Sequence, residues 1–350
     1  MAKQSINIGT SANDGTGSTL REAFDICNDN FTELYGGTTS ALGFKSEGTN
    51  FTGSLLIGHS TTGTLNDAQG NVGIGIGALD ALTSADNNIA IGRNAGTALT
   101  SGVANIAIGH ESLKTEDTTG GNVAVGFRTL KNQNANSSAY NVAVGYSAGE
   151  SVSTGIQNTI VGGLAGDSLT TGSDNVAVGL NALGLEDTGS RNVAVGKSAL
   201  ANQNYDGEAY NVAIGYNAGN QVTTGNLNTL IGGLAGDALT TGIQNVAIGY
   251  GALSSEDSHG KNVAIGYNTL NVQDAGADGY NVAIGYDAGL SVTTGVNNTI
   301  VGALAGDALT TGDRNTAIGL GALSTEDTGS RNVAVGWYAL INQNYDGTAY

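Results

Sequence analysis

The stretch Asn141–Gly149 reads NVAVGYSAG and recurs, with small edits, along most of the chain. Its Asn occurs in sixteen copies, each followed by Gly four residues later. Successive copies are separated by 17, 17, 17 and 19 residues, so a short unit is nested in a 70-residue unit. Fixed-period self-similarity indicates a solenoid, in which each unit is stabilised by stacking on its neighbours. The copies are Asn71, Asn88, Asn105, Asn122, Asn141, Asn158, Asn175, Asn192, Asn211, Asn228, Asn245, Asn262, Asn281, Asn298, Asn315 and Asn332.

Within one unit, Val142 and Val144 alternate with Ala143, which is the period-2 pattern of a strand with two unlike faces. We predict an all-β solenoid of stacked coils, each with two short strands and two turns. Equivalent asparagines are expected to stack as an amide ladder. Equivalent glycines are expected to mark a turn or a close backbone contact. In one 70-residue unit these residues are Asn141, Asn158, Asn175, Asn192, Gly145, Gly162, Gly179 and Gly196.

The second face of the strand carries mostly Ala followed by Gly, so another part of the assembly is expected to lie close to it. A roll with such small side chains buries little apolar area by itself. Three rolls around one axis would supply the missing core. We therefore predict a homotrimer that covers its Ala/Gly face between subunits, with a monomeric solenoid as the alternative.

Composition and charge narrow the class of protein further. The chain has 57 glycines, no proline and 5% aromatic residues, fewer large apolar residues than an ordinary globular core requires. Disorder is disfavoured because the apolar residues fall at strict intervals. The formal net charge of −18 disfavours nucleic acid and anionic membranes as partners. No stretch has the length and apolarity of a signal peptide or a membrane span, and the single cysteine, Cys27, excludes an intrachain disulfide.

The N-terminal segment, residues 1–37, differs from the repeats. Thr19 and Glu22 fit a capping box, which predicts a helix over residues 18–35, and Gly36 and Gly37 are expected to end it. So short a helix is not stable alone in water. It is expected to form a trimeric collar or, alternatively, to cap the first coil. Its apolar seam has heptad spacing and consists of Leu20, Phe24, Cys27, Phe31 and Leu34.

The remaining boundaries follow from the repeat. Residues 38–53 are a lead-in without a clear period, and residues 54–70 are a degenerate first coil, SLLIGHSTTG onwards. The regular shaft covers residues 71–350. Because Tyr350 aligns with residues that each precede a new repeat, we expect the natural polypeptide to continue. The shaft divides into units 71–140, 141–210, 211–280 and 281–350.

The phrase NVAIG at Asn211–Gly215, with Ala218 three residues later, resembles the head repeats of YadA-like trimeric autotransporter adhesins. About 280 residues carry this pattern. The resemblance implies a left-handed β-roll in a trimeric, non-enzymatic adhesive shaft. This chain departs from that family because the sequence shows neither a secretion signal nor a C-terminal membrane anchor.

Residues 6–37, INIGTSANDGTGSTLREAFDICNDNFTELYGG, look like the opening of tail-fibre-like virion proteins of tailed phages, especially cyanophages. Together the two resemblances imply a structural fibre of a virion, assembled in the host cytoplasm. Its N-terminus would bind other virion proteins, and its far end would face the host. The alternative is a cell-surface or filament-forming adhesin of the trimeric autotransporter kind.

Residues that carry chemistry are few. His59, His110 and His259 fall at unrelated coil positions, so we expect no metal site, no cofactor and no catalytic base. Four acidic pairs recur in the third coil of each unit, and we interpret them as solvated turn charges, since neighbouring residues of a strand point to opposite faces. The alternatives are calcium ligands and general acid/base pairs. The pairs are Glu116/Asp117, Glu186/Asp187, Glu256/Asp257 and Glu326/Asp327.

The 19-residue coils carry the longest loops, such as NQNYDGEAY at residues 202–210. Tyr205 and Tyr345 in these loops are candidate contacts for a host surface glycan. The alternative is that such tyrosines seal the groove between chains. A polysaccharide-degrading tailspike would need a cluster of carboxylates in a groove, which the sequence does not indicate.

Overall fold

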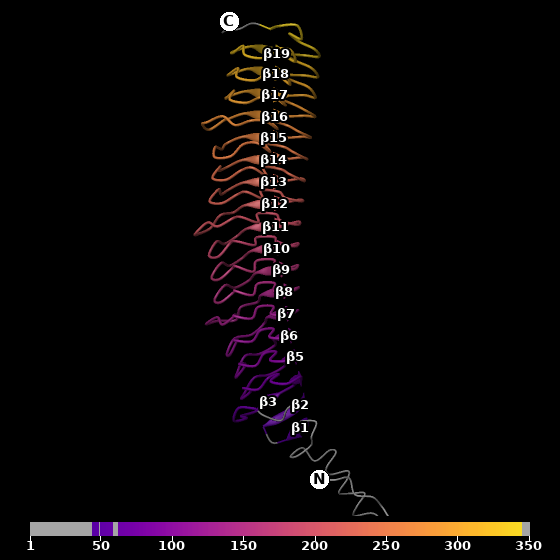
Figure 1. Cartoon of the computed structure of the whole chain (residues 1–350), viewed down its shortest axis with the longest axis vertical. Helices are drawn as coiled ribbons and strands as arrows, with labels where there is room; N and C mark the ends of the chain where they lie inside the picture. Colours follow the sequence, from indigo (N-terminus) through magenta and orange to yellow (C-terminus); the bar gives the residue numbers. More distant parts are fainter. Residues whose placement is uncertain (1–43, 49, 59–61, 345–350) are drawn as a thin grey trace, which may run out of the picture.

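The structure, a computed structural model, describes residues 44–48, 50–58 and 62–344. Over these residues the chain is an all-β, parallel solenoid of about 17 turns, without a helix. Figure 1 shows the coils stacked along one long axis, with strand labels following one another in chain order. The expected helix over residues 18–35 and its five seam residues lie outside the described part of the chain.

The first three strands are β1 (Phe44–Gly48), β2 (Phe51–Ile57) and β3 (Ala68–Gln69). Sixteen three-residue strands follow, one in each regular coil. They are β4 (Val72–Ile74), β5 (Ile89–Ile91), β6 (Ile106–Ile108), β7 (Val123–Val125), β8 (Val142–Val144), β9 (Thr159–Val161), β10 (Val176–Val178), β11 (Val193–Val195), β12 (Val212–Ile214), β13 (Thr229–Ile231), β14 (Val246–Ile248), β15 (Val263–Ile265), β16 (Val282–Ile284), β17 (Thr299–Val301), β18 (Thr316–Ile318) and β19 (Val333–Val335).

Each short strand pairs in parallel with the next at equivalent positions of the repeat. Ala177 of β10, for example, lies opposite Ala194 of β11 and Ile160 of β9. The described coils contain one such strand each, so the expectation of two strands per coil is wrong. Residues beyond the strand turn instead: in the coil after β8, both Ser147 (φ 50°) and Gly149 (φ 59°) are left-handed. Left-handed residues interrupt an extended strand.

The N-terminal end of the solenoid begins with a hairpin. β1 pairs antiparallel with β2, and β2 pairs in parallel with β4. Part of the expected lead-in, residues 38–53, is therefore a strand that covers the first sheet edge, where unpaired backbone groups would otherwise be exposed. Ser54 stands 17 residues before Asn71, and its Oγ accepts a hydrogen bond from the Asn71 backbone N–H at 2.9 Å. The degenerate coil thus uses a serine where later coils use asparagine.

The middle residue of each three-residue strand points into the roll. Ala143 is fully buried, whereas Val142 and Val144 on either side are each 37% exposed. The small-residue face is thus the interior of the chain's own roll. The expectation that this Ala/Gly face packs against another subunit is therefore wrong.

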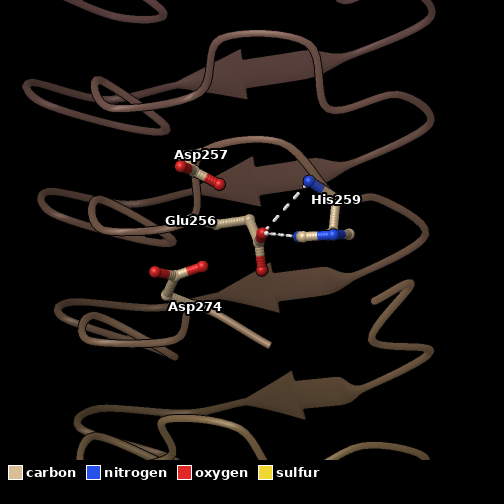
Figure 2. Close-up of side chains that lie close together, drawn as sticks. All are labelled: Glu256, Asp257, His259 and Asp274. Carbon is tan, nitrogen blue, oxygen red and sulfur yellow. Dashed lines mark hydrogen bonds and ion pairs between the residues drawn. The ribbon is translucent and has the colours of Figure 1, made fainter. Parts of the chain in front are cut away.

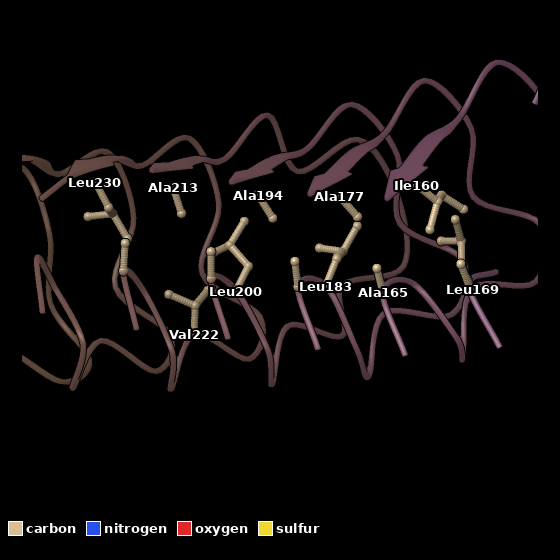
Figure 3. Packing of buried hydrophobic residues seen from close by; sticks show 14 of the residues in the cluster. Ile160, Ala165, Leu169, Ala177, Leu183, Ala194, Leu200, Ala213, Val222 and Leu230 are labelled. Carbon is tan, nitrogen blue, oxygen red and sulfur yellow. The ribbon is translucent and has the colours of Figure 1, made fainter. Parts of the chain in front are cut away.

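The interior is narrow, and the large side chain that fills it comes from the strand in one coil and from the turn in the next (Figure 3). In the coil that starts at Asn158, Ile160 fills the space from the strand and Gly166 faces it from the turn, with Ile160 carbons 3.5 Å from the position a Cβ would take. In the next coil the sizes are exchanged, because Ala177 lies on the strand and Leu183 on the turn, both buried. Because a large residue on one side faces a small one on the other, this exchange keeps the core filled without overpacking. Burial of each Leu or Ile side chain contributes about 1.5–3 kcal/mol to the stability of the fold.

Candidate interaction surface

The outer face of the sheet is a continuous uncharged strip that is mostly apolar. Its two rows come from the first and third residue of every three-residue strand, and every member is Val, Ile or Thr. None of these residues is charged, although the chain carries a net charge of −18. At about 4.8 Å per coil the rows run for about 70 Å. Contiguous apolar surface of this extent is typical of an interaction site.

Stacking alone does not bury these rows. In the middle of the rod Val142 and Val144 are 37% exposed, and in β19, the last described strand, Val333 and Val335 are 68% and 64% exposed. The neighbouring coil therefore covers only part of each side chain. About a third of Val142 and Val144 remains available to a partner, and the other members of the rows are at least partly exposed.

Stacked aromatic rings lie beside this strip, at the fifth residue after the repeat asparagine. Tyr267 stacks between Tyr250 and Tyr286, with ring centroids 5.7 and 5.5 Å apart. Phe127 stacks in the same way between His110 and Tyr146, at 5.2 Å on both sides. Tyr146 and Tyr286 are 61% and 56% exposed. The sequence analysis missed these rows, which an alignment of the coils at this one position would have revealed.

The asparagines form a buried ladder along the edge of the strands. The Asn158 backbone N–H donates to Oδ1 of Asn141 at 2.8 Å, and Nδ2 of Asn158 donates to the Gly172 carbonyl at 2.9 Å. The same pair of bonds recurs at Asn175. Most links in the ladder therefore join a side-chain amide to backbone, and only some join amide to amide, as Asn88 Nδ2 does to Asn71 Oδ1 at 3.0 Å.

The ladder continues across the two extra residues of a 19-residue coil, where the Asn211 N–H still donates to Asn192 Oδ1 at 3.2 Å, and a buried glutamine adds a second link. Between Asn192 and Asn211, Nε2 of Gln203 donates to Asn192 Oδ1 at 3.0 Å. Asn211 Nδ2 then donates to Gln203 Oε1 at 3.1 Å. Glutamine can do this because its amide offers both a donor and an acceptor.

The glycines four residues after each asparagine end the strands. Gly145 has φ 142°, and a Cβ there would lie 2.4 Å from the carbonyl oxygen of Gly162 in the next coil. Gly162 and Gly179 stand in the same relation, at 2.4 Å, as do Gly179 and Gly196. Both the conformation and the backbone contact therefore require glycine.

The loops of the 19-residue coils place tyrosines beside basic residues. Arg191 donates to the hydroxyl of Tyr210 at 2.6 Å, with its guanidinium 5.5 Å from the ring centroid. Lys261 is arranged similarly over Tyr280, and its hydrogen bond to Asp278 raises its pKa to about 12. Of the two candidate glycan contacts, Tyr205 is half-buried and its N–H donates to Glu186 Oε2 at 3.3 Å. Tyr345 lies outside the described residues.

In each acidic pair the glutamate is buried, whereas the aspartate is half-buried or exposed. All four glutamates, Glu116, Glu186, Glu256 and Glu326, are buried, so the expectation of solvated turn charges is wrong for them. Each accepts a hydrogen bond from the backbone N–H three residues later, at 2.7 Å from Gly189 to Glu186. Desolvation raises the pKa of the Glu116, Glu186 and Glu256 carboxyls.

One of these pairs lies in a larger cluster (Figure 2). Nδ1 of His259 is 3.4 Å from Oε1 of Glu256, and the ligand atoms of Glu256, Asp257, His259 and Asp274 all lie within 4.8 Å of one another. His259 thus lies in a group of possible metal ligands, which its position in the coil did not indicate. Asp274 is 15 residues away in sequence and is brought close by coil stacking, which is why the sequence analysis did not connect them.

Within the described residues, no helix has the length and apolar character needed to cross a membrane.

Comparisons with known proteins add no assignment. No protein-family model, curated protein or solved structure matches this chain.

Proposed function

We propose that this chain is a non-enzymatic structural fibre of a phage virion, a tail fibre or whisker, whose shaft is a homotrimer of parallel β-rolls. Its N-terminal segment binds other virion proteins, and its far end faces the host. The long rod of stacked coils supports a fibre, and the resemblance of residues 6–37 to virion proteins of tailed phages supports its place in a virion.

The observation that carries the proposal is the uncharged strip on the outer face of the sheet. A partner that covers the strip must present an apolar surface about 70 Å long, with side chains that recur about every 4.8 Å to match the coils. A second and third copy of the same chain, aligned in parallel, meet both conditions. The trimer interface is accordingly the Val/Ile face of residues such as Val142 and Val144, and the Ala face stays inside each roll.

The mass of the purified full chain tests the assembly. Light scattering after size exclusion should give three times the chain mass of 34.8 kDa. A mass of one chain, unchanged across a hundredfold range of concentration, would contradict the trimer.

The location is tested separately by immunogold electron microscopy of intact phage particles. Antibodies against residues 1–37 should label the base of a tail appendage, and antibodies against the coils should label its shaft. Unlabelled particles combined with labelled bacterial surfaces would favour the adhesin instead, which the NVAIG phrase supports. Release of oligosaccharides from host polysaccharide would contradict a non-enzymatic role.

A further inference from the structure

The four 70-residue units allow one cluster to be compared with its own equivalents. In the unit 211–280, His259 and Asp274 occupy positions that are Thr119 and Asn134 in the first unit. The second unit has Gly189 and Asn204 there, and the fourth has Gly329 and Asn344. Two ligand-type residues thus replace two non-ligands in the same unit, and the two positions are in contact only in the folded coil.

Stacking places the acidic groups of this cluster against one another. Asp257 and Asp274 stand 12 residues after Asn245 and Asn262, so they occupy the same position in successive coils. Figure 2 shows the Glu256 side chain extending between them and His259. Three carboxylates within 4.8 Å of one another repel unless a cation or a proton lies among them. In the other units an asparagine at the Asp274 position removes one of these charges.

An unsatisfied buried atom also points to a ligand. Glu256 is fully buried, and its Oε2 has no hydrogen-bond partner, while its Oε1 accepts from the His259 N–H at 3.2 Å. Buried carboxylate oxygens are normally paired or bound to a metal. Asp257 and Asp274 are exposed, so an ion can reach the cluster from solvent.

We propose that Glu256, Asp257, His259 and Asp274 bind one divalent transition-metal ion of the Zn²⁺ class. An imidazole nitrogen combined with carboxylate oxygens suits Zn²⁺ and its first-row neighbours, whereas Ca²⁺ and Mg²⁺ favour all-oxygen sites. Bonds of about 2.0–2.2 Å to a tetrahedral ion place ligand atoms about 3.3–3.6 Å apart. The four ligand atoms now lie within 4.8 Å of one another, so the site would have to contract around a bound ion. The ion would join two successive coils.

Calorimetric titration of the metal-free full chain with Zn²⁺ tests the site. The expected result is one Zn²⁺ per chain, no comparable binding of Ca²⁺, and a Co²⁺ absorption spectrum typical of a tetrahedral site. The double variant His259→Thr/Asp274→Asn gives this unit the residues of the first unit, so the fold is expected to tolerate it. Its Zn²⁺ affinity should fall at least about tenfold, since even partners of metal ligands contribute that much.

The reverse exchange provides a gain of function. Thr119→His/Asn134→Asp should create the same four ligands with Glu116 and Asp117, and raise the stoichiometry from one Zn²⁺ per chain to two. His110→Ala, a histidine outside the cluster, is the matched control and should leave binding unchanged. Absence of saturable Zn²⁺ binding by the wild-type chain, or equal binding by the His259→Thr/Asp274→Asn variant, would overturn the proposal.

Discussion

The two faces of the three-residue strands differ in side-chain size, and the smaller residues lie on the inner face. In most half-buried strands the larger apolar residues face the core, but here Ala143 faces inward and Val142 and Val144 face outward. The roll is too narrow for a β-branched residue on most strands, because Leu side chains from the turns already fill it. The inner face therefore holds the coils of one chain together, whereas the outer face is free to hold chains to one another.

The sharpest test of this difference places the same charge on each face of one strand. Ala247→Glu buries an unpaired carboxylate in the core of β14 and should lower the free energy of unfolding by about 3–5 kcal/mol. Val246→Glu, on the outer face, should keep the circular dichroism of the folded rod but reduce the mass in solution to that of one chain. Equal loss of folded structure in the two variants would show that the faces are not specialised in this way.

A second test removes one link of the buried ladder. Asn175→Ala leaves the Asn192 N–H and the Gly189 carbonyl without their partner, which should cost about 2–4 kcal/mol of stability. The exposed Asn136→Ala is the control and should change stability by no more than about 0.5 kcal/mol. Urea denaturation measures both. A loss at Asn175 no larger than the control would mean that the ladder does not stabilise the stack.

The buried glutamates predict a pH dependence that exposed ones lack. Burial raises the pKa of Glu186 in the folded state, so the folded chain takes up this proton more readily than the unfolded chain. The stabilising effect of protonation is complete below the ordinary carboxyl range and is lost as pH rises through the folded pKa. Glu186→Gln removes this charge but also one of the two acceptor oxygens that bind the Gly189 and Tyr205 N–H groups. The melting temperature of the variant relative to the unchanged chain should therefore be higher at pH 8 than at pH 4.

Gln203 shows that glutamine fits the equivalent position of the next coil. Asp206→Asn, on the exposed loop, is the control for the charge change, because the hydrogen-bond partner of Asp206 is the neutral Thr188 hydroxyl, and it should leave the pH dependence of melting as it is. The same shift in both variants would contradict a special role for the buried carboxyl.

The smallest effect is expected in the aromatic rows beside the outer strip. Tyr267→Ala removes the central ring of a three-ring stack and should cost about 1 kcal/mol or less, since the ring is 46% exposed. Tyr216→Ala removes a ring whose neighbours in adjacent coils are Lys197 and Gly233, and should cost less. Thermal melts compare the two. A larger loss at Tyr216 would mean that ring stacking does not contribute to coil stability.

The spacing of residues in the sequence predicted some features of the fold but not others. The solenoid was predictable because an Asn and a Gly four residues later recur in every 17- or 19-residue unit. The burial of Glu186 was not, because a carboxylate next to Asp187 in a polar stretch resembles an ordinary turn. The hydrogen bond it receives from Gly189 depends on how the loop folds back. The cluster at His259 was also missed, since coil stacking brings Asp274 beside it.

The sequence by itself determined that the backbone winds into stacked coils, because a strict period leaves each unit the same neighbours above and below. It also determined where those coils begin and end, through Asn141, Gly145 and their equivalents. Only the tertiary structure decided which face of the strand is inside. An alternating pattern distinguishes two faces but does not orient them. The orientation depends on the space left by residues such as Leu183, which come from the opposite wall of the roll and leave room on the strand for little more than alanine.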